Sequence, residues 1–152
     1  MLMAQYKVVV VDSDVSYLRH VLDTLKGLEP RSDSFTINGL PKAPKEFREV
    51  AENVTVTVVN KRQLAKEYVE VNSVDLVVLE ASDSDADISA VEAAEQMREL
   101  GYKGRIAMQT PSIVDGYTTS VLTRVIDDVF IRQDAEGLFR YIAEQYAKRE
   151  RQ

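Results

Sequence analysis

The sequence predicts an α/β fold in which helices cover both faces of a parallel β-sheet. Residues 8–11 and nearly all of residues 75–79 are aliphatic. Their apolarity is continuous, as in strands that are buried on both faces of a sheet. Segments with apolar residues at steps of three and four, typical of amphipathic helices, lie between the expected strands. Strands that alternate with helices in this way pair in parallel.

The first half of the chain contains two expected strands separated by a long connection. The strand at residues 8–11 leads into a helix whose apolar stripe runs from Tyr17 to Leu28. The second strand, residues 54–59, begins only after an insertion over about residues 30–53, which contains a short expected helix around Phe47. Most connections in compact domains have about 4–6 residues. The insertion therefore either packs on its own domain or docks a partner.

The second half alternates regularly between helices and strands. The expected elements are a helix at residues 64–69, a strand at 75–79, a helix at 88–100, a strand at 105–109, a helix at 121–125, a strand at 129–131 and a helix at 134–146. Gly101 lies where glycine commonly ends a helix, and Asp134 can cap the last helix. Five strand–helix pairs predict a flavodoxin-like, doubly wound (βα)5 fold, in which functional groups gather at the carboxyl ends of the strands.

Length and composition narrow the class of protein. The 152 residues suit one domain over 1–152. A net charge of −6 argues against a nucleic-acid partner, and Lys61-Arg62 and Lys148-Arg149 are expected to be solvated charges. With no cysteine and one histidine, His20, disulfides and multi-histidine metal sites are excluded. No apolar run reaches the ~18–20 residues of a membrane span, and no signal peptide is visible, so we expect a cytoplasmic protein with no membrane contact.

Polar residues at the ends of the expected strands form the candidate site. They are Asp12, Ser13, Glu80, Thr110 and Arg132. The carboxyl ends of parallel strands lie at one edge of the sheet, so these side chains should converge. In a phosphoryl-transfer site, acids hold a divalent metal and one acid accepts the phosphoryl group. A hydroxyl bonds a phosphoryl oxygen, and a cation neutralises its charge.

Some of these residues also have a purely structural explanation. Asp12 can cap the following helix, and Thr110 can be an ordinary hydroxyl at a strand end. The acidic segment at residues 83–87 alternates aspartates as a calcium loop does, but it lacks the glycine and distal glutamate of an EF-hand loop. Asp85 or Asp87 is therefore expected to cap the helix that follows.

The strand-end residues resemble those of the receiver domains of two-component response regulators. The similar fragments, in chain order, are residues 10–14, 75–80, 85–87, Thr110 and 126–132. The resemblance implies a phosphorylation pocket at Asp12, Ser13, Glu80, Thr110 and Arg132, with a phosphoacceptor aspartate at the position of Glu80 and a bound Mg²⁺ ion.

Three of these positions depart from the pattern of the family. Glu80 replaces the phosphoacceptor aspartate, Ser13 replaces a second acid that would bind magnesium, and Arg132 replaces a lysine. The glutamate carboxylate lies one methylene farther from the backbone than that of an aspartate. A shift of about 1 Å in the position of the attacking oxygen matters greatly to a positioned reaction. We therefore expect a vestigial pocket with no catalytic residue and no cofactor, in which Glu80 pairs with Arg132. Any Mg²⁺ ion would be held by Asp12 and Glu80.

These observations predict a pseudo-receiver, a non-enzymatic signalling module that works by phosphorylation-independent protein–protein interaction. Its partner would be another signalling protein, an output protein or a second copy of the chain. The resemblance implies a partner face on the last two helices and the last strand, where Tyr117 and Tyr141 are the candidate anchors. Phe139 and Tyr146 are expected in the core, and Tyr141 at the core or its rim.

The alternative is a functional receiver, phosphorylated by a histidine kinase on an acid of the altered pocket such as Glu80 or Asp83. A nucleotide-binding enzyme is a weaker alternative, because the chain has six glycines and none of the glycine-rich phosphate-binding motifs.

Overall fold

A computed structural model describes residues 5–12, 45–80, 88–110, 125–131 and 135–150. The described strands form one five-stranded parallel sheet in the order β2-β1-β3-β4-β5. They are β1 (Tyr6–Val11), β2 (Val54–Val59), β3 (Leu76–Glu80), β4 (Arg105–Thr110) and β5 (Asp128–Ile131). The strand order reverses between β1 and β3, which is the flavodoxin-like arrangement. The predicted fold class is confirmed.

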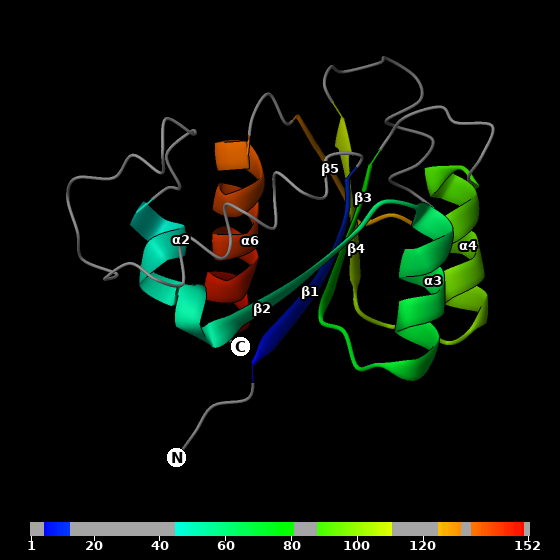
Figure 1. The fold of residues 1–152 in the computed structure, drawn as a ribbon, viewed down its shortest axis with the longest axis horizontal. Coiled ribbons are helices and arrows are strands. Elements are labelled where there is room, and N and C mark those ends of the chain that lie inside the picture. The colour runs from blue at the N-terminus through cyan, green and yellow to red at the C-terminus, as the bar shows by residue number, and fades with distance from the viewer. Residues whose placement is uncertain (1–4, 13–44, 81–87, 111–124, 132–134, 151–152) are drawn as a thin grey trace.

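Helices pack on both faces of this sheet (Figure 1). The described helices are α2 (Lys45–Val50), the 3₁₀ helix η1 (Ala51–Asn53), α3 (Arg62–Val71), α4 (Ala90–Glu99) and α6 (Ala135–Glu150). Figure 1 shows α2 and α6 on one face and α3 and α4 on the other. The helix expected at 17–28 and nearly all of the one expected at 121–125 lie outside the described residues. None of the described helices is long and apolar enough to cross a membrane.

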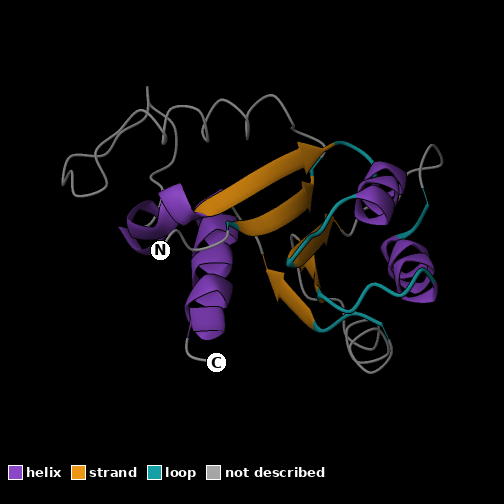
Figure 2. Ribbon diagram, turned by 90° about the horizontal axis from the view of Figure 1, so that it is seen from below, coloured by secondary structure: helices purple, strands orange, loops and turns teal. Residues whose placement is uncertain are grey.

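The sheet separates two hydrophobic cores. Alternate residues of β1, such as Val8 and Val10, face α2 and α6, whereas Val9 and Val11 face α3 and α4. The two layers are visible in Figure 2, which shows the sheet between the two groups of helices. Burial on both faces explains why residues 8–11 of β1 and 76–79 of β3 are apolar at successive positions rather than at every second one.

The carboxyl-terminal part of the insertion packs on its own domain. Phe47 of α2 is 2% exposed and lies in the core beside α6. Its ring centroid is 4.8 Å from that of Phe139, with the two planes tilted by 30°. Val50 packs against the same core. Residues 30–44 of the insertion lie outside the described residues, so a partner-docking role for them stays a prediction.

The helix ends differ in part from the prediction. Ser89 caps α4, and its hydroxyl accepts a hydrogen bond of 3.1 Å from the Glu92 amide. The prediction that Asp85 or Asp87 caps this helix is wrong, because Ser89 occupies the N-cap position and supplies the acceptor. Asp85 and Asp87 themselves lie outside the described residues. Gly101 follows α4 with a φ of 91°, a left-handed conformation that glycine adopts without steric cost. Its predicted role as the helix stop is confirmed.

Tyrosines that are buried near the amino edge of the sheet should make the protein sensitive to alkaline pH. Burial is the largest cause that raises the pKa of Tyr6 from 10.0 to about 12, and burial also raises the pKa values of Tyr102 and Tyr141. A pKa that is higher in the folded state contributes stability that is fully present below pH 10 and is lost as the pH rises toward 12. We expect the melting temperature to fall over this range, and to fall less steeply in Tyr6→Phe. An equal slope in the variant would contradict the assignment.

Candidate functional site

The sheet register brings three of the predicted site residues to one edge. Val10 of β1 pairs with Val78 of β3, so Asp12 and Glu80 each lie two residues beyond this pair. Glu80 pairs with Gln109, and the next residue of β4 is Thr110. Asp12, Glu80 and Thr110 therefore follow one another at the carboxyl ends of the adjacent strands β1, β3 and β4, as the sequence predicted.

These three side chains differ in exposure. Asp12 is 3% exposed, and its amide donates a hydrogen bond of 2.9 Å to the Val59 carbonyl at the end of β2. Thr110 is also buried, whereas Glu80 is partly exposed. The edge thus offers one buried carboxylate, one accessible carboxylate and a buried hydroxyl. Such groups can accept hydrogen bonds and bind cations.

The remaining predicted site residues are not described by the structure. Ser13, Arg132 and Tyr117 lie outside the described residues. The ion pair between Glu80 and Arg132 therefore stays a prediction.

Asp12 and Glu80 are the described carboxylates that could bind a metal at this edge. No group of three or more histidine, cysteine, aspartate or glutamate residues within the described ranges is placed to hold a metal ion. Magnesium prefers six oxygen ligands in near-octahedral geometry and keeps several waters when the protein supplies few of them. The described residues thus do not complete the acid set that the receiver resemblance implies.

Arg62 is a component of this edge that sequence reasoning missed. It was expected to be a solvated charge, but it is 2% exposed. Its Nη1 donates to the Glu80 carbonyl at 2.7 Å, and its Nε donates to the Ile88 carbonyl. The expectation was wrong because the backbone carbonyls of Glu80, at the end of β3, and of Ile88, two residues before α4, solvate the guanidinium in place of water. Leu64, the first residue of the helix expected at 64–69, is 40% exposed.

Gln109 is a second polar residue buried at this edge. It follows the apolar residues 106–108 of β4, and its Nε2 donates a hydrogen bond of 2.9 Å to the Val11 carbonyl of β1. The bond joins β4 to β1 although β3 lies between them in the sheet. A glutamine within a buried strand is a sequence signal that could have identified it, because buried amides need partners.

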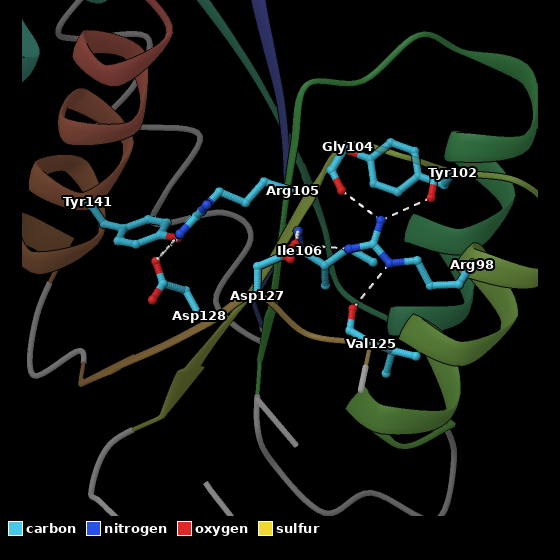
Figure 3. A network of polar contacts seen from close by, with 9 residues as sticks. All are labelled: Arg98, Tyr102, Gly104, Arg105, Ile106, Val125, Asp127, Asp128 and Tyr141. Carbon is cyan, nitrogen blue, oxygen red and sulfur yellow. Dashed lines mark hydrogen bonds and ion pairs between the residues drawn. The ribbon is translucent and has the colours of Figure 1, made fainter. Parts of the chain in front are cut away.

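Tyr141 occupies an interior position beside β5. It is 7% exposed, and its ring stacks on Phe130 with centroids 4.2 Å apart and planes 9° apart. Its hydroxyl donates to Asp128 at 2.9 Å, and Arg105 pairs with the same carboxylate at 2.8 Å (Figure 3). The predicted core-or-rim position agrees with this burial. In this conformation the ring offers little surface to a partner, and its role as an interface anchor stays a prediction.

Solved structures with a similar fold include response-regulator receiver domains. One is a two-component response regulator from Clostridium difficile, with a TM-score of 0.61, 19% identity, and coverage of 91% of this chain and 93% of that one. A CheY-like receiver domain protein from Methanospirillum hungatei JF-1 has a TM-score of 0.66 and 14% identity, and the match covers 97% of this chain and 98% of that one. The response regulator domain of Thermotoga maritima CheB has a TM-score of 0.58 at 17% identity, over 97% and 94% of the two chains.

No protein-family model matches the sequence, and no curated protein matches it either. At identities this low, the structural likeness shows the fold only. The chemistry of the site must be argued from the residues that form it. The described sheet and helices have the fold of response-regulator receiver domains.

Proposed function

We propose that the protein is a signal-transduction module of the receiver fold that works by protein–protein contact and does not depend on phosphorylation. The observation that carries the proposal is Glu80. It lies at the carboxyl end of β3, beside Asp12 and Thr110 in the register, at the position where the resemblance implies the phosphoacceptor aspartate.

The length of the Glu80 side chain argues against phosphoryl transfer. A glutamate carboxylate lies one methylene farther from the backbone than an aspartate carboxylate. Its attacking oxygen is therefore displaced by roughly a bond length, and a displacement of about 1 Å can cost on the order of 100-fold in a positioned reaction. Ser13, in place of a second acid, also removes one anionic ligand for magnesium.

A phosphorylation assay tests this proposal directly. We expect no phosphoryl adduct by intact mass after incubation with magnesium and acetyl phosphate. We also expect no shift of the Asp12, Glu80 or Thr110 amide resonances with magnesium and beryllofluoride. As a control, the double variant Ser13→Asp/Glu80→Asp restores both acids and should gain magnesium-dependent shifts. A stoichiometric, magnesium-dependent adduct on the natural sequence would defeat the proposal and favour a functional receiver.

The partner of such a module is another signalling protein, an output protein or a second copy of the chain. A pull-down compares the complete chain with a variant that lacks part of the insertion. Removal of all of residues 30–53 would also remove Phe47 and Val50 from the core. A deletion confined to residues 31–44 keeps both, so a loss of binding would report on the insertion surface rather than on unfolding.

A further inference from the structure

The guanidinium of Arg62 is buried at the carboxyl edge of the sheet. Neither the composition of the chain nor the receiver resemblance explains this burial. Arg62 is the first residue of α3, and no acidic residue lies in the first turn of that helix. A cation at a helix N-terminus is disfavoured by the helix dipole, and burial of a charge is costly unless it is hydrogen-bonded. A long arginine side chain at a helix start could reach solvent, so its contacts must offset both costs.

Two of those contacts lie on either side of one segment. The Glu80 carbonyl ends β3, and the Ile88 carbonyl lies two residues before the start of α4. Residues 81–87 connect them. One planar, rigid group thus fixes the two ends of this connection relative to each other and to the start of α3. Hydrogen bonds from a charged donor are also stronger than those between neutral groups.

We propose that Arg62 is a positioning residue of the candidate site, which clasps the backbone before and after residues 81–87. The clasp orients the peptide group that follows Glu80, and it holds the carboxyl end of β3, the start of α3 and the start of α4 in one arrangement. This inference rests on the proposed function and deepens it. It names a group of the chain itself that orders the pocket without a metal or a phosphoryl group.

Amide hydrogen exchange, measured by NMR in buffer without magnesium or phosphate, tests the clasp. The reporters near Ile88 are the Glu92 amide, bonded to the Ser89 hydroxyl at 3.1 Å, and the Ala93 amide, bonded to the Ser89 carbonyl at 2.9 Å. The reporters at the amino edge are the Asp75 amide, bonded to the Lys7 carbonyl at 2.8 Å, and the Asp127 amide, bonded to the Ile106 carbonyl at 2.7 Å.

In Arg62→Met we expect exchange at the near reporters to accelerate at least tenfold more than at the amino edge. Arg62→Lys keeps the charge but replaces the planar fork by a point donor. Its near reporters should therefore exchange at rates between those of Arg62→Met and the natural sequence. If Arg62→Met does not fold, Arg62→Lys carries the same comparison of near and far reporters.

Lys66→Met on the same helix is the matched control. Lys66 forms an ion pair with Glu70 one turn away, at 3.5 Å, and its replacement should leave the ratio of near to far exchange unchanged. An equal acceleration at both edges, or none, in the Arg62 variants would overturn the clasp. A phosphoryl adduct on the natural sequence would instead defeat the proposed function, and it would leave the exchange comparison as it stands.

Discussion

Replacement of Phe47 by alanine is expected to lower the free energy of unfolding by about 3–5 kcal/mol, the usual cost of a buried phenylalanine. The ring is almost fully buried between α2 and the core that includes α6, and it packs on Phe139. Its removal leaves a cavity that the short α2 cannot close by itself. Urea unfolding followed by far-ultraviolet circular dichroism measures the effect, since the chain has no tryptophan for fluorescence.

Two further variants separate packing from other effects of the change. Phe47→Leu retains most of the apolar volume and should cost less than half as much. Val71→Ala removes methyl groups from a side chain that is 81% exposed, and it should change stability by less than about 0.5 kcal/mol. A loss below about 1 kcal/mol in Phe47→Ala would show that the insertion is only loosely attached to the domain.

The strands could be predicted because strands of a parallel sheet that is covered on both faces contain continuous runs of apolar residues. The predicted ranges of β2 and the observed strand coincide at residues 54–59, and the other strands agree within two residues at each end. The beginning of β1 was missed, since the exposed Lys7 separates the buried Tyr6 from the apolar run. A short helix carries a weaker pattern than a long one, but the apolar spacing around Phe47 was sufficient to indicate α2.

The candidate site could be predicted only in part. Asp12, Glu80 and Thr110 follow from topology, because every carboxyl end of a parallel strand reaches the same edge. Arg62 and Gln109 did not follow. The carbonyls that Arg62 binds are 18 and 26 residues away, and the carbonyl that Gln109 binds is 98 residues away. Local pattern assigns an arginine to the surface, and only the tertiary fold supplies such distant acceptors.

Replacement of Arg98 by methionine should cost about 2–4 kcal/mol, since each net hydrogen bond contributes about 0.5–1.5 kcal/mol. Arg98 lies in the last turn of α4 and contacts the segments that lead into β4 and β5 (Figure 3). Its guanidinium donates to the carbonyls of Val125 at 3.2 Å, Tyr102 at 2.9 Å and Gly104 at 2.8 Å, and it pairs with Asp127 at 2.9 Å.

Three backbone carbonyls would lose this donor together. The Asp127 carboxylate would lose its cation as well. It also accepts a hydrogen bond of 2.8 Å from the Ile106 amide, so in the natural sequence it links the end of α4 to the first residues of β4. Arg105→Met is the matched control. It removes an arginine of 38% side-chain exposure that pairs with Asp128 and donates a long bond of 3.4 Å to the Tyr141 hydroxyl. For such an exposed pair about 1 kcal/mol or less is expected. Similar losses in the two variants, measured by urea unfolding, would contradict the view that Arg98 acts through its several carbonyl acceptors. A larger loss in Arg98→Met would show that its carbonyl contacts anchor the carboxyl end of α4.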